Sequence, residues 1–429
     1  MNFDFKRYLT IQNVDKFLFV ILTVFIFVLI INNAVANVHF DDADHVLMLN
    51  AFRNSIDYTF FNQLNGSNIE DLVKANRIFP EYRFPGYSIM GVFPSYFLSF
   101  LDIAFNFPHN NEDNICNNIG SWDDIMLTEL LSKIISGENE FNINCNFLIS
   151  LFLVSYISLI VGIYFCAKLL FLLKEKYTFL SIIPILILSL PIFLHNILIT
   201  PLYHTAFSFG LISIFSYFFI KEMNKKIKDV NLFIPGLILG FIAITRIEGI
   251  LLFIAIVIFC KYKKLGVNLV LFIKGFFPAI TVFLFYNFLI LKNPLEFGFL
   301  NNSFNYFALN FKYIFDTTIN PVSGLLFYST LLILGIFILY KHPNKNIKFF
   351  FIFSLLIIFS LLFRLSVLNN CSVGEKVLVD SIWYNCFGST EELTRFDNNR
   401  YILILFPFSI IGLNYLLNLG LKRIKDKKG

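Results

Sequence analysis

The sequence predicts an all-α polytopic membrane protein with about ten transmembrane helices. Of its 429 residues, 57% are hydrophobic and only 15% are charged, whereas a soluble domain is about half apolar and a quarter charged. Apolar runs of about 20 residues, the length of a membrane-crossing helix, recur along the chain. Basic residues gather in the short segments between these runs. This composition excludes a soluble globular enzyme, a disordered chain and a nucleic-acid-binding protein.

The first apolar run, residues 17–36, is interpreted as a retained transmembrane helix. The alternative is a cleaved signal peptide, but the run is longer than the usual apolar core of one, and its A-x-A-like trace is confined to Ala34-Val35-Ala36. A long polar segment, 37–147, follows. The later apolar runs lie near 148–172, 178–199, 201–220, 232–260, 267–291, 322–340, 347–366 and 401–420.

The distribution of charge orients these runs. The two termini and four short loops (174–176, 221–229, 261–264 and 341–348) hold 20 of the 34 Lys and Arg residues and only six acidic residues. The segments 37–146, 292–320 and 367–400 hold ten basic and 22 acidic residues. Basic loops stay in the cytoplasm, so both termini are predicted to be cytoplasmic and the long acidic loops to face outward. We expect an integral protein of the bacterial inner membrane.

The run 232–260 is too long for one crossing. A single helix of this length would measure about 43 Å, against a hydrocarbon core of about 30 Å. A single crossing would also move the basic tail after residue 420 to the outside. We therefore predict two short helices that meet near 245–249. Helix breaks at membrane depth are tolerated only where protein or a wet cavity surrounds them, so Arg246 and Glu248 are expected to face such a cavity.

The apolar stretch 87–107 is interrupted by Pro94. Counting it as a crossing would invert everything that follows, so we expect a helix lying at the outer membrane interface. No internal repeat or Pro/Ser-rich linker divides the chain. Residues 1–429 are treated as one membrane domain whose first outer loop, 37–147, is elaborated.

The segment just after the first helix carries three carboxylates and two imidazoles at the expected outer boundary. It reads His39-Phe40-Asp41-Asp42-Ala43-Asp44-His45. Ionisable groups at a membrane edge are costly to place and are functional candidates. Adjacent carboxylates repel each other, which poises one of them as a general base, or they share a divalent cation. The alternative is a solvated helix start that Asp41 or Asp42 caps.

Four further clusters map to the same expected outer face. In 83–87, Arg83 can grip a phosphate and Pro85-Gly86 fixes a tight turn, although an ordinary turn with a snorkelling arginine explains it equally well. In 245–249, Arg246 and Glu248 either serve a polar cavity or pair with each other or with neighbouring helices as structural glue. The last two clusters are Asn287 with 293–298, and Trp383-Tyr384 with Arg395, Asp397, Arg400 and Tyr401.

Taken in order, these segments resemble the GT-C superfamily of membrane glycosyltransferases. Asp41-Asp42-Ala43 is similar to the D-[DE]-A opening of that family, and 83–87 to its R-x-P-G-Y element. Residues 236–240 with 245–249 resemble the G-L-L-L-G…T-R-P-E-G helix pair, and Tyr286-Asn287 with 293–298 the Y-N…G-N-P-L-x-x-G stretch. The series is completed by 324–329 and by Arg400-Tyr401…Pro407, and it covers roughly residues 17–410.

Within the superfamily, the chain most resembles the bacterial relatives of dolichyl-phosphate-mannose–protein mannosyltransferases. The resemblance implies transfer of a sugar from a polyprenyl-phosphate donor to a lipid, glycan or protein acceptor outside the membrane. It implies that Asp41 or Asp42 is the catalytic carboxylate. Arginines would stabilise the phosphate leaving group, with Arg246 the first choice and Arg83 and Arg400 behind it. Glu248 and Tyr401 complete the expected substrate-binding set.

The chain departs from the family pattern at three places. Ile247 stands where the family usually has proline, and 200–204 lacks the acidic residue often found beside a proline there. Residues 108–146 are interpreted as a private insertion. Family members differ in their need for metal, so a divalent cation held by Asp41, Asp42 and Asp44 stays an open possibility.

Two functions of other classes are alternatives to a glycosyltransferase. A transporter or flippase of lipid-linked or polar substrates would place its key charges near the bilayer midplane in two related halves. A membrane scaffold without chemistry would present clusters that do not converge on one cavity.

Six cysteines divide between helices and outward loops. Cys166 and Cys260 are expected to be small apolar fillers in helices, and local pairing of Cys116 with Cys145 and of Cys371 with Cys386 is possible in the outward loops.

Overall fold

The computed structural model describes the helical part of the chain and one short hairpin. The described positions are 45, 48–49, 52–53, 55–57, 59, 85–105, 145–173, 204–246, 248–291, 293–295, 330–367, 376–379, 382–385 and 405–428. The predicted runs 17–36 and 178–199, the insertion 108–146 and most of the first outer loop therefore lie outside the described residues.

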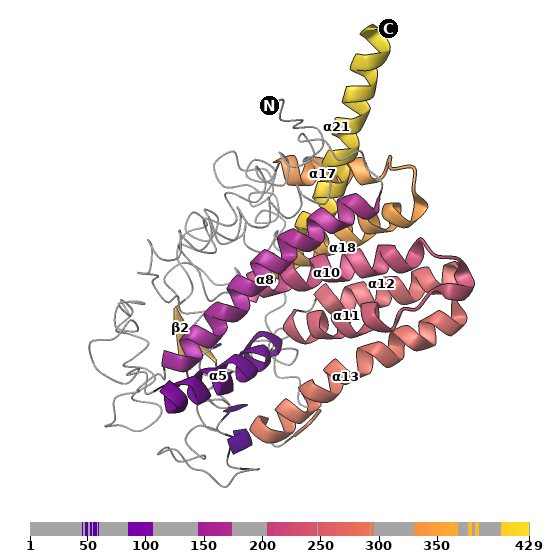
Figure 1. Ribbon diagram of the computed structural model, residues 1–429. Helices are drawn as coiled ribbons and strands as arrows, with labels where there is room; N and C mark the ends of the chain where they lie inside the picture. Colours follow the sequence, from indigo (N-terminus) through magenta and orange to yellow (C-terminus); the bar gives the residue numbers. More distant parts are fainter. Residues whose placement is uncertain are drawn as a thin grey trace, which may run out of the picture.

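The described helices fall on the predicted apolar runs (Figure 1). They are α8 (Cys145–Leu172), α10 (His204–Met223), α13 (Gly266–Leu291), α17 (Thr330–Leu339), α18 (Lys345–Val367) and α21 (Phe406–Lys428). In the described residues, three segments are long and apolar enough to cross a membrane: Ile149–Leu172, Thr205–Met223 and Asn268–Ile290. The chain is thus a helical, membrane-associated protein.

The run 232–260 divides into two helices, as predicted. They are α11 (Phe233–Thr245) and α12 (Glu248–Tyr262). With 13 and 15 residues, they are about 20 and 22 Å long, which is shorter than a hydrocarbon core of about 30 Å. The chain reverses between them, so the start of α11 and the end of α12 lie at the same end of the molecule.

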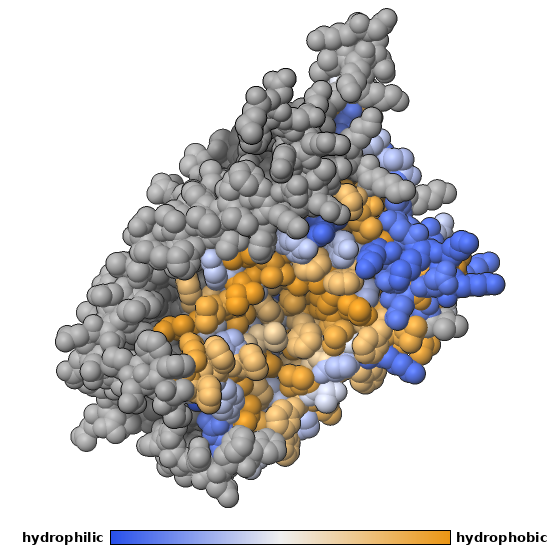
Figure 2. All heavy atoms as spheres, in the orientation of Figure 1, coloured by the Kyte–Doolittle hydropathy of each residue, from blue (hydrophilic) through white to orange (hydrophobic). Residues whose placement is uncertain are grey.

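Three basic connections gather at this end. Asn268 Nδ2, in α13, donates to the Ile227 carbonyl at 3.3 Å, which joins the loop after α12 to the short 3-10 turn η1 (Ile227–Asp229). Asn346 Nδ2, in α18, donates to the Met223 carbonyl at 3.3 Å. These bonds draw together the loops 224–232, 263–265 and 340–344 and their lysines. We call this region the lysine-rich end, and Figure 2 shows its hydrophilic side chains beside an apolar face.

The loop after α12 ends in an unusual backbone conformation. The Leu265 N–H donates to the Cys260 carbonyl and the Lys264 N–H to the Lys261 carbonyl, which is the Schellman pattern of a helix end. Lys264, at the position where glycine is usual, has a φ of 57°. A non-glycine residue is strained there.

Glycines let the helix backbones touch. A Cβ atom on Gly240 of α11 would lie 2.8 Å from the Phe276 carbonyl oxygen of α13, and one on Gly210 of α10 would lie 2.7 Å from the Ser158 carbonyl oxygen of α8. Gly335 of α17 and Gly412 of α21 meet in the same way. Small residues at membrane helix contacts allow close packing where lipid supplies no hydrophobic drive. The glycines of the 236–240 motif therefore have a packing role.

Phenylalanine serves both the interior and the lipid-facing surface. Phe209, Phe350 and Phe408 are fully buried and pack edge-to-face or stacked against other rings, while Phe277 and Phe359 are 61% and 67% exposed. Figure 2 shows apolar side chains across the visible face of the described helices. An apolar ring on the surface of a membrane protein contacts lipid chains, which are themselves apolar. This explains why aromatic side chains that a soluble protein would bury can lie on the surface here.

The stretch 87–107 forms α5 (Gly86–Phe105), which continues through Pro94. The expectation that Pro94 interrupts this segment is wrong. Proline removes one backbone N–H donor, but the rest of the helix keeps its bonds, and the Ser95 hydroxyl adds a bond to the Val92 carbonyl at 2.7 Å. The helix packs lengthwise against α8, and Phe93 and Phe97 point outward, 81% and 54% exposed.

One hairpin departs from the all-α expectation. Strands β1 (Lys376–Val379) and β2 (Ile382–Asn385) pair antiparallel, with Lys376 opposite Asn385 and Val379 opposite Ile382. The predicted Trp383-Tyr384 cluster lies on β2. Four residues per strand form too short a period-2 pattern to stand out in the sequence.

The contact between α17 and α21 should depend on the absence of a side chain at Gly412. A Cβ added there would overlap the Gly335 carbonyl, so Gly412→Ala should lower the free energy of unfolding by about 1–3 kcal/mol. Gly420→Ala, on the same helix with nothing within 4 Å, should be neutral or stabilising by up to about 1 kcal/mol. Thermal unfolding in detergent compares the two variants. Equal midpoints would contradict the proposed contact.

Candidate functional site

The centre of the candidate site is the break between α11 and α12. Arg246 is extended, with φ −152° and ψ 140°, and its N–H donates to the Ile242 carbonyl to end α11. Its carbonyl accepts the Gly249 N–H at 3.0 Å as α12 begins. The break lies one length of α11, about 20 Å, from the lysine-rich end. It therefore places a basic and an acidic residue far from the lysine-rich end, between two apolar helices.

Arg246 and Glu248 form a buried, forked ion pair. Arg246 Nε donates to Glu248 Oε2 at 3.1 Å, and Nη2 donates to Oε1 at 2.8 Å. The two side chains are 2% and 1% exposed. Two parallel hydrogen bonds fix the plane of the guanidinium and offset the desolvation of both charges. Of the two sequence interpretations, the pairing of these residues is confirmed, while a substrate-binding role stays a prediction.

Removing one partner of this pair should destabilise the protein strongly. Arg246→Met or Glu248→Gln leaves the other group buried without the two forked hydrogen bonds. The free energy of unfolding should fall by about 3–5 kcal/mol. The double variant Arg246→Met/Glu248→Leu should recover most of that loss, because neither charge then remains. Unfolding in detergent measures all three variants.

The matched control is the partly exposed pair of Lys225 with Glu222, whose Nζ–Oε1 distance is 2.7 Å and whose lysine side chain is 41% exposed. Lys225→Gln should change stability by less than about 1 kcal/mol. Equal, small effects at both pairs would rule out a structural role for the buried one.

Gly86 brings the turn of the 83–87 cluster against this break. A Cβ on Gly86 would lie 2.8 Å from the Ile244 carbonyl oxygen and would collide with the Thr245 hydroxyl. Only glycine leaves room for this approach. The start of α5 therefore packs directly on the end of α11, and two clusters far apart in sequence are brought together.

His45, directly after the acidic segment 41–44, is bound to the same turn. The Ser88 hydroxyl donates to the His45 carbonyl at 3.0 Å and lies 3.1 Å from His45 Nδ1. The His45 ring meets the Tyr87 ring edge-on, with centroids 5.0 Å apart. The Tyr87 hydroxyl in turn donates to the Leu151 carbonyl at 2.8 Å and contacts Ser155 Oγ at 2.6 Å. These bonds hold His45 against α5, and α5 against α8.

The Tyr286-Asn287 cluster joins the same region. Tyr286 packs against Phe52 with ring centroids 5.0 Å apart, and Ile89 of α5 borders their cluster. Asn287 Nδ2 donates to the Pro294 carbonyl at 3.4 Å, which links the end of α13 to the turn after it. Helix α5 thus links segments of four predicted clusters: its start packs on the α11–α12 break, Ser88 binds His45, and Ile89 borders the cluster that holds Tyr286.

The remaining predicted site residues are not described. They are Asp41, Asp42, Asp44, Arg83, Arg400 and Tyr401. Cys116, Cys371, Cys386 and the side chain of Cys145 also lie outside the described residues, whereas Cys166 and Cys260 are buried in helices, as predicted. In the described part of the chain, no three His, Cys, Asp or Glu side chains gather as metal ligands would.

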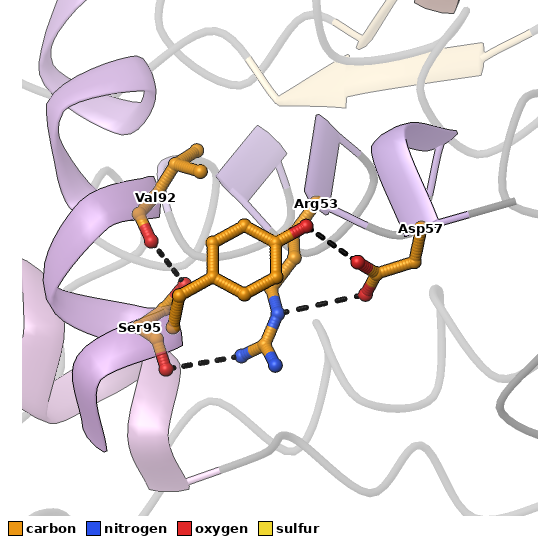
Figure 3. A network of polar contacts seen from close by, with 5 residues as sticks. Arg53, Asp57, Val92 and Ser95 are labelled. Carbon is orange, nitrogen blue, oxygen red and sulfur yellow. Dashed lines mark hydrogen bonds and ion pairs between the residues drawn. The ribbon is translucent and has the colours of Figure 1, made fainter. Parts of the chain in front are cut away.

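A second polar network escaped the sequence analysis. The Arg53 guanidinium lies 3.7 Å from Asp57 Oδ2, donates to the Ser95 carbonyl at 3.2 Å and stacks over the Tyr96 ring at 4.6 Å (Figure 3). The Tyr96 hydroxyl donates to the Asp57 carboxylate. Arg53 also approaches the Phe147 ring of α8 at 5.4 Å. Arg53 thus clamps the described helical positions 52–53 and 55–57 to α5 and α8.

This network favours a neutral tyrosine. Burial raises the pKa of the Tyr96 phenol above its ordinary value, and the hydrogen bond to Asp57 and the charge of that carboxylate raise it further. The phenol therefore stays protonated as a donor to Asp57. In the sequence, Arg53 and Asp57 look like an ordinary i,i+4 surface pair. Their position beside the apolar Met48, Leu49 and Phe52 was the available sign that they are partly buried.

The Arg53 network should show energetic coupling. Arg53→Met removes the guanidinium from both Asp57 and the Tyr96 ring, and should cost about 1–3 kcal/mol. Tyr96→Phe removes only the phenol donor. In a double-mutant cycle, the two changes should couple by about 1 kcal/mol, with Arg53→Lys testing whether charge alone suffices. Strictly additive effects would show that the two side chains act independently.

No protein-family model, curated protein or solved structure matches this chain. The geometry and the sequence pattern are therefore the basis for a functional assignment.

Proposed function

We propose that the chain is an integral-membrane glycosyltransferase that moves a sugar from a polyprenyl-phosphate donor to an acceptor on the outer face. The supporting observation is the meeting of four clusters at one place. His45, after the acidic segment, is bound to Ser88 of the turn whose Gly86 packs on the break between α11 and α12, where Arg246 and Glu248 pair. Tyr286 lies in a cluster bordered by Ile89 of the same helix α5. A scaffold without chemistry would not require chemistry-bearing residues to converge.

The topology proposed with it has ten transmembrane helices and both termini in the cytoplasm. The lysine-rich end would then be cytoplasmic by the positive-inside rule, and the break would lie toward the outer side. We place the protein in a bacterial inner membrane. The first outer loop, including α5 and the insertion 108–146, would cover the site and contact the acceptor.

The proposed reaction uses a carboxylate and arginines. Asp41 or Asp42 removes the proton of an acceptor hydroxyl, whose oxygen attacks the anomeric carbon of the sugar. The bond between that carbon and the phosphate oxygen breaks, and polyprenyl phosphate leaves with the negative charge. Arg246, with Arg83 and Arg400, stabilises the charge. Glu248 holds the plane of the Arg246 guanidinium, and Tyr401 contributes to binding.

A transporter or flippase is the second candidate, because one observation favours it. The helices α11 and α12 have 13 and 15 residues, too few to cross a bilayer alone, and a buried charged pair lies at the break between them. Substrate sites of transporters are often formed by such discontinuous helices. Against it, the four clusters meet on one side of the bundle rather than in two related halves.

The catalytic carboxylate gives the decisive test. Membranes containing Asp41→Asn or Asp42→Asn protein are incubated with radiolabelled polyprenyl-phosphate sugars, and label moved to any acceptor is measured. Loss of the general base should lower transfer by about 10²–10⁴-fold in at least one variant, with unchanged protein levels. Asp229→Asn, at the exposed lysine-rich end, is the matched control and should keep full transfer.

Full transfer by both Asp41→Asn and Asp42→Asn would overturn the glycosyltransferase proposal. If intact lipid-linked sugar crosses the membrane of sealed vesicles and no label moves to an acceptor, the transporter would be supported instead.

A further inference from the structure

We propose that the lysine-rich end is a binding face for the headgroups of anionic phospholipids. Its lysines come from three connections that are far apart in sequence and from the adjoining ends of α10, α12 and α18. They are Lys221, Lys225, Lys226, Lys228, Lys261, Lys263, Lys264, Lys341 and Lys348. All but the half-buried Lys263 are exposed. This inference does not depend on the transfer reaction.

The negative charges at this end do not cancel the lysines. In the described segments 221–232, 261–266 and 340–348, the carboxylates are Glu222 and Asp229. Glu222 is 8% exposed; it accepts from Lys225 Nζ at 2.7 Å and from the Asn231 N–H at 2.8 Å. Its charge is therefore used to hold the loop between α10 and α11. The remaining ammonium groups give this end a strong positive potential.

Exposed apolar side chains lie among these lysines. Tyr262 is 82% exposed, Tyr340 is 62% exposed and Ile227, between Lys226 and Lys228, is 66% exposed. Lys348 Nζ lies 5.7 Å from the centre of the Tyr340 ring. Tyrosines with lysines are typical of the membrane–water boundary, where rings enter the lipid and ammonium groups reach the headgroup phosphates. Figure 2 shows the hydrophilic region adjoining the apolar face directly.

This mixture favours lipid over a soluble acidic partner. A soluble polyanion would satisfy the lysines but would leave Tyr262, Tyr340 and Ile227 in water. A bilayer surface with anionic headgroups satisfies both, because acyl chains and phosphates lie side by side at that level.

Lys264 adds a separate indication. Its φ of 57° is the conformation in which glycine ends a helix without strain. The chain has lysine there, so the positive charge is present despite an unfavourable backbone. The side chain is exposed, so its ammonium group is available to a headgroup phosphate.

The test uses the full-length protein in nanodiscs of phosphatidylcholine mixed with phosphatidylglycerol. Lipids retained by the protein after mild detergent extraction are counted by native mass spectrometry. Wild-type protein should retain phosphatidylglycerol in preference to phosphatidylcholine, and the preference should fall as salt is raised. The triple variant Lys225→Gln/Lys226→Gln/Lys228→Gln should reduce the preference for phosphatidylglycerol more than tenfold, since each lysine near a charged surface strengthens binding about fivefold. The triple variant with arginine at the same three positions should keep the preference for phosphatidylglycerol.

A second variant separates lipid binding from folding. Lys264→Gly should raise the unfolding temperature because it relieves the backbone strain, yet it should lower the preference for phosphatidylglycerol. Equal retention of the two lipids by wild type, or unchanged retention by the triple Gln variant, would overturn the proposal. So would equal competition by soluble glycerol phosphate or polyglutamate, which would indicate a site for free anions or for an acidic protein.

Discussion

The whole arrangement depends on direct contact between helix backbones. Water drives apolar helices together in a soluble protein, but lipid does not, so packing itself must supply the attraction. Here glycines on both partners make that possible. Gly236, Gly240 and Gly275 join α11 to α13, and Gly335 with Gly412 joins α17 to α21. Each contact sets the relative height of two helices, and so fixes which residues can meet at the break.

The break is enclosed by that packing. α11 runs beside α13, so Thr245 and Arg246 end close to the level of Tyr286, while Gly86 seats the start of α5 on the same turn. The described positions before α5 are then held at two points of that helix, through His45 with Ser88 and through Arg53 with Ser95. The buried ion pair at the break is thereby packed among helices.

Sequence reasoning succeeded where hydropathy and charge act over many residues. The positions of α8, α10, α13 and α18, and the division of 232–260, followed from run length and from the placement of lysines. Prediction from sequence failed where local features of a few residues determine the secondary structure. Pro94 was expected to interrupt a segment that stays helical while it packs against α8, and the hairpin 376–385 was too short to show a period.

For the site, the sequence pattern identified the clusters but not their contacts. The pairing of Arg246 with Glu248 was one of two interpretations, because two residues of opposite charge at i,i+2 face each other only when the helix is broken. The Arg53 network was missed, since its partners Ser95 and Tyr96 are about 40 residues away and only the packing of α5 on α8 brings them near. The roles of Asp41, Asp42, Arg83, Arg400 and Tyr401 stay predictions.

The short hairpin of α11 and α12 also constrains how the protein is made. A segment needs about 20 apolar residues to enter a bilayer by itself, and neither helix, of 13 and 15 residues, reaches that length. In the proposed topology the two would therefore be inserted together during synthesis, as one unit that starts and ends on the same side. The charges that would oppose insertion are separated by one residue and pair with each other, so they can neutralise each other within the unit.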